Sequence, residues 1–363
     1  MPLSCGIVGL PNVGKSTLFN ALTRSSVAAS NYPFCTIDPN IGAVVVPDPR
    51  LPVLAALFGS RQTVPATMQF VDIAGLVRGA SRGEGLGNAF LAHIREVSAI
   101  AMIVRCFEQS DVVHVDERPD PLRDIETINI ELALADLGTV QRRLEKTRQR
   151  AKAGADSAAE LAALENLVQA LNAGRPARAF GADTPEKTLA KELSLLSAKP
   201  LLYIANVDEL GTVASQERAA AVRSYAESQR APSIVLCAKL EAELAGLPAD
   251  EAPAFAKDFG LEARALDRFI GAAYRLLNLM TFLTAGAKQA RAWPIVRGAT
   301  AVSAAAEIHT DMARGFIRAE IAAFDELARR GSLQAVKDAG LLRIEGRDYV
   351  MQEGDVVNFR FNV

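Results

Sequence analysis

Short apolar runs alternate with stretches of helical periodicity along most of the chain. Five of these runs have the length and composition of buried strands, and they span residues 5–9, 68–72, 100–107, 201–207 and 234–239. The helical patterns between several of them predict a parallel α/β sheet with right-handed crossovers. Because ligands of such sheets bind beyond the carboxyl ends of the strands, candidate site residues are expected directly after these runs.

The interval 121–199 departs from this alternation. Apolar residues recur at helical spacing over 125–144 and again over 161–171, and Gly154 lies between the two patterns. This predicts two long helices that form an antiparallel arm inserted in the α/β domain. The first helix carries a basic run, residues 142–152, which is either a solvated helix face or a contact for RNA or an acidic partner.

The character of the chain changes again near residue 280. Residues 308–316 are predicted to be helical, residues 317–321 to form a strand, and residues 348–363 to form a β-hairpin that turns at Gly354. The sequence therefore predicts a small α+β domain at this end.

Composition limits the class of protein further. A chain of 363 residues, 50% of them hydrophobic, is long enough for two or three domains. The net charge is −2 with both signs mixed, so no overall basic field attracts nucleic acid, and DNA is not an expected partner. The cysteines, Cys5, Cys35, Cys106 and Cys237, are widely spaced, which favours small buried thiols in a reducing compartment. With no signal peptide and no membrane-length apolar run, we expect a cytoplasmic protein without membrane contact.

Residues 9–16 read Gly-Leu-Pro-Asn-Val-Gly-Lys-Ser and fit the phosphate-loop pattern G-x-x-x-x-G-K-[ST] between a strand and a helix. Gly9 and Gly14 let the backbone curl so that consecutive N–H groups face one anion. Lys15 is expected to reach the β- and γ-phosphates, and the Ser16 hydroxyl to bind Mg²⁺. The sequence thus predicts a nucleoside triphosphate site formed by Asn12, Val13, Gly14, Lys15, Ser16 and Thr17.

A second motif, Asp72-Ile73-Ala74-Gly75, follows the run that ends at residue 72. We expect Asp72 in the Mg²⁺ shell and the Gly75 N–H at the γ-phosphate. Thr36 is the natural second hydroxyl ligand, in a loop ordered by the triphosphate, unless it is a plain turn threonine. The predicted metal ligands are therefore Ser16, Thr36 and Asp72.

Base recognition is expected after the last two strands. A guanine site uses Asn-Lys-x-Asp, whose aspartate accepts two hydrogen bonds from guanine, but this chain reads Asn206-Val207-Asp208-Glu209. The longer Glu209 removes the main reason to prefer GTP. In the loop after the last strand, the Ala238 N–H is a candidate contact to the base, so Asn206, Val207, Glu209 and Ala238 are the predicted base-site residues.

Together the motifs resemble the Obg-like ATPase (YchF) family across essentially the whole chain. The resemblance rests on GLPNVGKST, NYPFCTIDPN, DIAGLVRGAS, GEGLGN, VRCF, ANVDE, IHTD, GFIRAE and the terminal GDVVNFRFNV. It implies a Ras-like, Obg-type G domain (residues 1–120 and 200–278), a helical coiled-coil insert (121–199) and a C-terminal TGS, β-grasp-like domain (279–363). It also implies ATP favoured over GTP, backbone contact between Val207 and adenine, and ribosome binding, for which we expect the large subunit, ribosomal RNA and a monomeric chain.

Turnover is expected to be slow, because Leu76 follows the second motif where a water-orienting glutamine is usual. His114 either positions the attacking water or is an exposed loop histidine; the predicted catalytic residues are His114, Lys15 and Gly75. Asn12 is a candidate for holding K⁺ beside the β/γ bridge. The leading hypothesis is a slow ATPase switch; a GTPase of the same fold and a nucleotide-sensing module with negligible catalysis remain alternatives.

Overall fold

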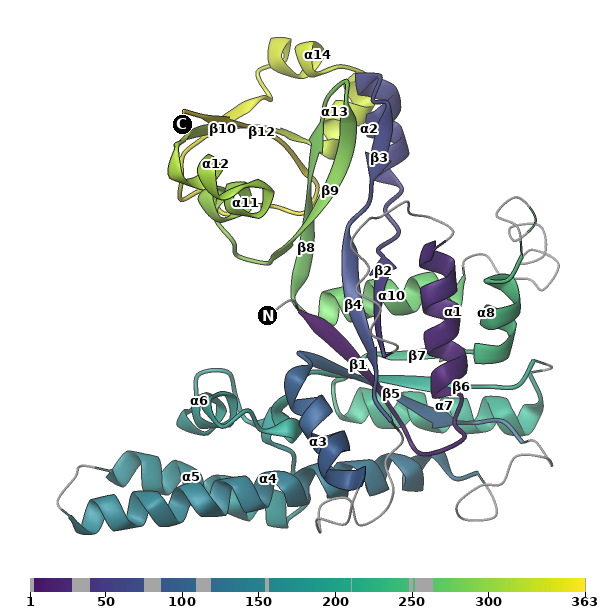
Figure 1. Cartoon of the computed structure of the whole chain (residues 1–363), viewed down its shortest axis with the longest axis vertical. Coiled ribbons are helices and arrows are strands. Elements are labelled where there is room, and N and C mark those ends of the chain that lie inside the picture. Colours follow the sequence, from purple (N-terminus) through teal and green to yellow (C-terminus); the bar gives the residue numbers. More distant parts are fainter. Residues whose placement is uncertain are drawn as a thin grey trace. The chain divides into compact units, whose positions relative to one another are not determined.

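The computed structural model describes residues 3–27, 40–74, 86–108, 119–153, 157–209, 211–247, 251 and 264–362 (Figure 1). The chain folds into two compact units. The first comprises Met1–Gly42 and Gln69–Phe269, and the second comprises Ala43–Met68 and Ile270–Val363. The second unit therefore contains an internal segment of the chain as well as its C-terminal part.

The first unit is built on a six-stranded sheet with the order β2-β4-β1-β5-β6-β7. The strands of this sheet are β1 (Ser4–Val8), β2 (Ile41–Val45), β4 (Thr67–Asp72), β5 (Ala99–Arg105), β6 (Leu201–Asn206) and β7 (Ser233–Leu236), and the division between the two units falls within β2 and within β4. The pairs β1–β4, β1–β5, β5–β6 and β6–β7 are parallel, which confirms the predicted parallel sheet. Every residue of β1, β5 and β6 is buried, which explains why these strands read as continuous apolar runs.

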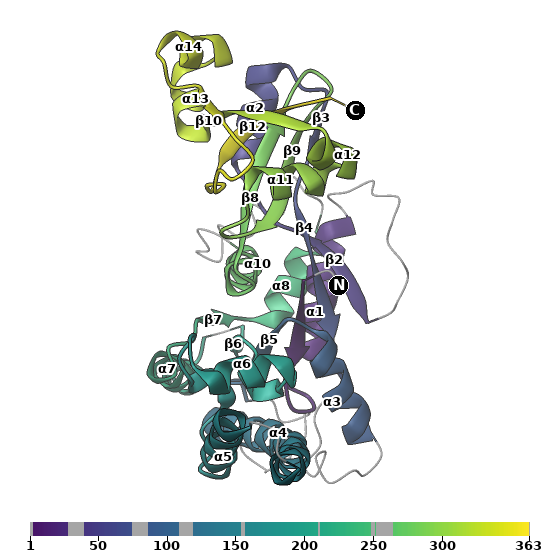
Figure 2. The ribbon, with the colours of Figure 1, turned by 90° about the vertical axis from the view of Figure 1, so that its left-hand side faces the viewer.

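Helices cover both faces of this sheet. Figures 1 and 2 show α1 and α8 on one side of the strands and α4 and α7 on the other. The helices of this unit are α1 (Lys15–Val27), α3 (Leu86–Glu96), α4 (Pro121–Lys152), α5 (Ala158–Asn172), α6 (Pro185–Glu192), α7 (Val213–Ser228) and α8 (Ala238–Leu244), and α10 (Ala265–Leu276) begins in it. None of the helices in the described part of the chain combines the length and hydropathy needed to span a bilayer.

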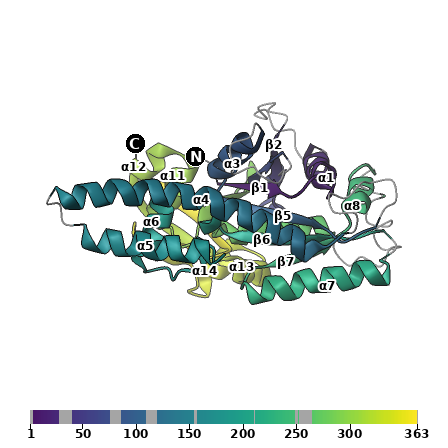
Figure 3. The ribbon, with the colours of Figure 1, turned by 90° about the horizontal axis from the view of Figure 1, so that it is seen from below.

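The two long helices predicted for the insert are confirmed as α4 and α5, which lie side by side in Figure 3. Asp120 caps α4 by accepting a hydrogen bond from the Arg123 N–H, and Pro121 occupies the first turn. Buried leucines join the two helices, and the predicted periodicity supplies them. The buried Asp136 carboxylate of α4 accepts hydrogen bonds from the N–H groups of Leu196 and Ser197, at 2.7 and 2.8 Å. These bonds hold α4 against the turn that precedes β6.

Three residues of the basic run on α4 form ion pairs with carboxylates of α5. Arg143 and Arg150 each lie 2.7 Å from a carboxylate oxygen of Glu160, and Arg148 lies 2.8 Å from Glu165. Neither of the two interpretations drawn from the sequence included this arrangement. It assigns part of the basic charge to holding the two helices together.

The second unit contains a six-stranded sheet with the order β11-β10-β12-β8-β9-β3. Its strands are β3 (Gln62–Val64), β8 (Leu279–Ala285), β9 (Gln289–Val296), β10 (Phe316–Ala323), β11 (Arg343–Glu345) and β12 (Asp355–Phe361). Its helices are α2 (Arg50–Phe58), α11 (Ala301–Ile308), α12 (Thr310–Arg314), α13 (Phe324–Arg330) and α14 (Leu333–Asp338). Four strands each contribute one aromatic residue, Phe282, Trp293, Phe316 or Phe359, to the core, which also contains alanines of α11.

Two expectations about this unit need correction. Residues 43–68 were assigned to the nucleotide-binding domain, but they group with the C-terminal part because β3 pairs in parallel with β9. The hairpin predicted for 348–363 does not form, because β12 pairs with β10 and β8 instead. The Asp355 carboxylate accepts hydrogen bonds from the Gln352 N–H and the Tyr349 hydroxyl, which folds the preceding segment into a turn.

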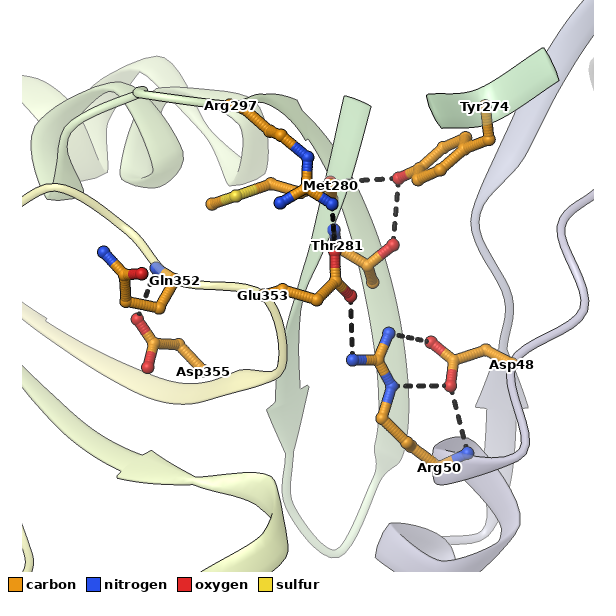
Figure 4. Close-up of polar contacts among 9 residues, drawn as sticks. All are labelled: Asp48, Arg50, Tyr274, Met280, Thr281, Arg297, Gln352, Glu353 and Asp355. Atoms are coloured by element: carbon orange, nitrogen blue, oxygen red, sulfur yellow. Dashed lines mark hydrogen bonds and ion pairs between the residues drawn. The ribbon is translucent and has the colours of Figure 1, made fainter. Parts of the chain in front are cut away.

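A polar network holds the internal segment in the second unit (Figure 4). The guanidinium group of Arg50 contacts the Asp48 carboxylate at 2.7 Å and the Glu353 carboxylate at 2.8 Å. Glu353 also accepts a hydrogen bond from the Thr281 N–H at 3.1 Å, and Thr281 contacts the Tyr274 hydroxyl at 2.9 Å. The two carboxylates raise the pKa of Arg50 despite its partial burial, so the guanidinium stays charged.

Candidate nucleotide-binding site

The predicted phosphate loop connects β1 to α1 in the geometry that anion binding requires. Asn12 and Gly14 have positive φ angles of 61° and 96°, which turn the backbone before α1 begins at Lys15. A Cβ atom on Gly14 would lie 2.4 Å from the Asn206 side-chain nitrogen, and one on Gly9 would lie 2.6 Å from the Ile103 carbonyl oxygen. Both glycines are therefore required by close approach of neighbouring groups.

Lys15, Ser16 and Asp72 come together at the start of α1. The Ser16 hydroxyl donates to Asp72 Oδ2 at 3.3 Å, so the two motifs found in the sequence meet in space. Burial lowers the pKa of Lys15, and the negative charge of Asp72 opposes that shift. An ammonium group that is partly buried in this way is stabilised when a polyphosphate supplies further negative charge.

The Asp72 carboxylate fits a metal ligand. Its Oδ1 atom is buried and has no hydrogen-bond partner within the described residues. An orphaned carboxylate oxygen beside a serine hydroxyl is the oxygen-rich donor set that Mg²⁺ prefers. Ser16 and Asp72 are therefore positioned to hold the ion together.

Asn206 links the phosphate loop to the base side of the site. Its Nδ2 donates to the Val13 carbonyl oxygen, and its Oδ1 accepts from the Ala238 N–H, both at 2.9 Å. The Ala238 N–H is thus engaged by Asn206 and does not point to a base in this arrangement. The Val207 N–H is also engaged, because it donates to the Leu236 carbonyl oxygen at 2.9 Å.

A pocket of about 360 Å³ adjoins the phosphate loop at the carboxyl ends of β5, β6 and β7. This is where a parallel sheet binds its ligands. The pocket joins predicted site residues to others from the same strand ends. It is lined by Gly14, Thr17, Phe107, Glu108, Asn206, Val207, Asp208, Glu209, Cys237, Ala238 and Lys239.

A larger hollow, of about 920 Å³, lies between α4, α5 and α7. None of the phosphate-loop residues lines it. It is therefore not the candidate nucleotide site, despite its size.

Phe107, which the sequence did not identify as a site residue, forms one wall of the pocket. The guanidinium carbon of the buried Arg105 lies 4.7 Å from the centre of the Phe107 ring, and Arg105 Nε donates to the Phe107 carbonyl oxygen at 3.2 Å. Arg218 donates to the Cys106 carbonyl oxygen at 3.3 Å and pairs with Glu108. Phe107 and Glu108 lie just beyond the carboxyl end of β5, after Cys106. Their position near a strand end is the sequence signal that could have identified them.

Three predicted site residues lie outside the described residues: Thr36, Gly75 and His114. Leu76 and Cys35 also lie outside them. Of the other cysteines, Cys5 and Cys106 are buried and Cys237 is half-buried, with free thiols.

The fold and the site define a P-loop nucleoside triphosphatase domain joined to a second α/β unit. A family model described as "50S ribosome-binding GTPase" matches residues 4–150, and the YchF-type GTPase C-terminal model, described as "Protein of unknown function (DUF933)", matches residues 279–362. The chain is 51% identical over its whole length to the full-length "Ribosome-binding ATPase YchF" of Haemophilus ducreyi, and 48% identical to that of Bacillus subtilis. The solved structure of the Schizosaccharomyces pombe YchF GTPase matches with a TM-score of 0.88 and 35% identity, covering 99% of this chain and 97% of that one. The chain belongs to the YchF family.

Proposed function

We propose that this protein is a Mg²⁺-dependent ATPase that acts as a nucleotide switch on the ribosome. The observation that carries the proposal is the meeting of Ser16 with Asp72, whose second carboxylate oxygen is buried without a partner beside the phosphate loop. The relatives of this chain in H. ducreyi and B. subtilis are named ribosome-binding ATPases, which supports the same activity here.

The roles of the site residues follow from their chemistry. Lys15 and the N–H groups of the phosphate loop bind the β- and γ-phosphates and orient the γ-phosphate for in-line attack. Ser16, Asp72 and Thr36 would hold Mg²⁺, which neutralises charge on the phosphates when it is bound. The Gly75 N–H would contact the γ-phosphate, and His114 would orient the attacking water in place of the glutamine that Leu76 replaces. Without that glutamine the chemical step is slow.

ATP is the proposed substrate rather than GTP, because the sequence lacks the aspartate of a guanine site. The Val207 N–H already donates to the Leu236 carbonyl oxygen, so the Val207 carbonyl oxygen is the backbone group that would accept a hydrogen bond from the adenine amino group. The names of the relatives differ on this point, since the S. pombe protein is called a YchF GTPase. A GTPase of the same fold is therefore the second candidate function.

The ribosome is the proposed partner, through its large subunit and ribosomal RNA. The paired helices α4 and α5 form the proposed docking arm, and the second unit is a proposed TGS-type domain. Parallel pairing of β12 with β8, between the antiparallel pairs β8–β9 and β10–β12, supports a β-grasp-like arrangement. We propose that the protein acts as a monomer.

Two experiments test these proposals. Replacement of Lys15 by alanine should abolish binding of labelled ATP and phosphate release, whereas undiminished affinity would refute the nucleotide site. Cosedimentation with ribosomes and with isolated subunits, with and without a non-hydrolysable ATP analogue, tests the switch and the choice of subunit.

The alternatives give different results. Competition of ATP and GTP for a fluorescent nucleotide separates the ATPase from the GTPase. A nucleotide-sensing module would bind ATP and ribosomes but show no phosphate release, even with ribosomes added. Ribosome-stimulated hydrolysis would exclude that module.

A further inference from the structure

Two oppositely charged side chains face each other at the base end of the pocket. The Lys239 ammonium lies 2.8 Å from Glu209 Oε1 and 3.1 Å from Glu209 Oε2, so it contacts both carboxylate oxygens. Lys239 belongs to the first turn of α8, and Glu209 follows β6, which places them at neighbouring strand ends. Both residues line the pocket beside Val207 and Ala238.

The other two carboxylates of the pocket are engaged as well. Glu108 pairs with Arg218 on the wall formed by the residues after β5. Asp208 accepts hydrogen bonds from the N–H and the hydroxyl of Thr212, at 3.0 and 2.7 Å. Each carboxylate in the described lining of this pocket therefore has a partner within the protein.

This arrangement bears on the choice of purine. Guanine presents two adjacent donors, N1–H and the 2-amino group, and a site that selects it needs a carboxylate ready to accept both. The Lys239 ammonium group bridges both Glu209 oxygens, which is the position where paired donors approach a carboxylate, so guanine can bind there with both donors only if the ammonium group moves. Adenine carries an acceptor at N1, so it makes no such demand and can itself accept a hydrogen bond from the ammonium group.

We propose that Lys239 is a specificity-determining residue that lowers affinity for guanine nucleotides by occupying the Glu209 carboxylate. The inference rests on the proposed nucleotide site and goes further by assigning purine selectivity to this ion pair. The longer Glu209 side chain still places a carboxylate in the pocket. The ion pair with Lys239 is what makes that carboxylate unavailable to guanine. Selectivity is thus a property of two loops acting together.

The test compares nucleotide affinities of the full-length chain and three variants. Dissociation constants for non-hydrolysable ATP and GTP analogues are measured with Mg²⁺ by calorimetry. Lys239→Met removes the charge and keeps an apolar stem, Lys239→Arg keeps the ion pair, and the double variant Lys239→Met with Glu209→Gln removes both charges. Lys239 is 69% exposed, so these changes are compatible with folding, which circular dichroism verifies.

The expected result is specific to the ion pair. In Lys239→Met the ratio of GTP-analogue to ATP-analogue affinity should rise about tenfold or more. A site built to hydrogen-bond a substrate N–H can discriminate against an analogue that lacks it by more than this factor. Lys239→Arg should keep the wild-type ratio, and the double variant should return toward it, because the carboxylate that guanine would use is gone.

Three outcomes would overturn the inference in distinguishable ways. A ratio in Lys239→Met that stays within twofold of wild type, with binding intact, refutes the role of Lys239 and leaves the proposed site standing. A ratio that rises equally in the double variant also refutes it, because Glu209 would then not be the group involved. Failure of the wild-type chain to bind either analogue refutes the proposed nucleotide site and the inference with it.

Discussion

The side-chain amide of Asn206 donates to the carbonyl oxygen of Val13 at 2.9 Å, across 193 residues of sequence. The same side chain accepts from the Ala238 N–H, so it joins the phosphate loop to the loop after β7. Because Asn206 is only 4% exposed, both hydrogen bonds are shielded from water. The phosphate half and the base half of the site are thus held in register by one residue.

Replacement of Asn206 by alanine should weaken ATP binding by about 30-fold or more, since two buried hydrogen bonds are lost and each one left unmade costs ~1–3 kcal/mol. The loss arises because Val13 and Ala238 keep unpaired polar groups and the phosphate loop is no longer fixed. Titration with a fluorescent ATP analogue measures it. Asn129→Ala is the matched control, because the Asn129 amide also makes two hydrogen bonds, to the side chains of Tyr225 and Arg178, but lies away from the phosphate loop. Equal loss of affinity in both variants would contradict the assignment.

The proposed Mg²⁺ ligands Ser16 and Asp72 lead to a prediction about the Mg²⁺ dependence of turnover. Ser16→Ala removes a hydroxyl ligand and should shift the Mg²⁺ concentration for half-maximal turnover upward by about tenfold, the effect of losing one interaction worth ~1.4 kcal/mol. The measurement is phosphate release against Mg²⁺ concentration. Ser25→Ala is the control, because that hydroxyl also lies on α1 but bonds to the Ala21 carbonyl oxygen. An unchanged Mg²⁺ dependence in Ser16→Ala would remove this serine from the metal site.

Asn12 provides the test of a monovalent cation. If it helps to hold K⁺ beside the β/γ bridge, turnover should be higher in K⁺ than in Na⁺ by roughly tenfold, the size of one charge-assisted interaction of about 1.5 kcal/mol. Asn12→Ala should reduce that difference. Equal rates of wild-type turnover in the two salts would exclude the idea.

Sequence patterns could predict the first unit well, because its strands are buried on both faces and its phosphate loop has a fixed spacing. The five predicted strands and both insert helices formed where periodicity placed them. The Ser16–Asp72 contact was also predictable, since parallel strands bring their carboxyl ends to one edge. These features follow from local patterns and from a topology with few alternatives.

Other features depend on long-range pairing that no local pattern encodes. β3 has three residues and joins a sheet whose other strands lie more than 200 residues further on, as the Gln62–Gln289 register shows. The turn before β12 depends on Asp355, which collects donors from Tyr349 and Gln352 rather than allowing a hairpin. The Lys239–Glu209 pair depends on the spacing between two loops, so it became visible only in the structure.

The ion pairs of Glu160 should make the stability of the α4–α5 helix pair depend on pH. The hydrogen bond from Arg143 lowers the pKa of Glu160 below its ordinary value of 4.5, with Thr147 and Arg150 contributing in the same direction. A carboxylate whose folded-state pKa is lowered stabilises the fold above its unfolded pKa, and that contribution disappears as pH falls through the folded-state pKa. At neutral pH, Glu160→Gln should therefore speed hydrogen exchange in α5 by about fivefold, for a loss of ~1 kcal/mol.

The same comparison below the folded-state pKa should show no difference between Glu160→Gln and wild type, because both side chains are then neutral. Glu165→Gln serves as the control, since its pair with Arg148 is half exposed and exposed pairs contribute little. A pH-independent difference would show that Glu160 acts through packing rather than charge.

The ion pairs of Arg50 with Asp48 and Glu353 are expected to stabilise the second unit. Arg50→Met leaves the Asp48 carboxylate, 6% exposed, without its cation and should lower the free energy of unfolding by ~1–3 kcal/mol, below the cost of breaking a fully buried pair. The only tryptophan of the chain, Trp293, lies in the core of this unit, so its fluorescence during urea unfolding reports the unit directly. Arg314→Met is the matched control, because Arg314 is 78% exposed and lies 3.5 Å from Asp311, and its loss should change the free energy by less than ~0.5 kcal/mol. If the two variants unfolded at the same urea concentration, the network around Arg50 would not be what holds residues 43–68 against the C-terminal strands.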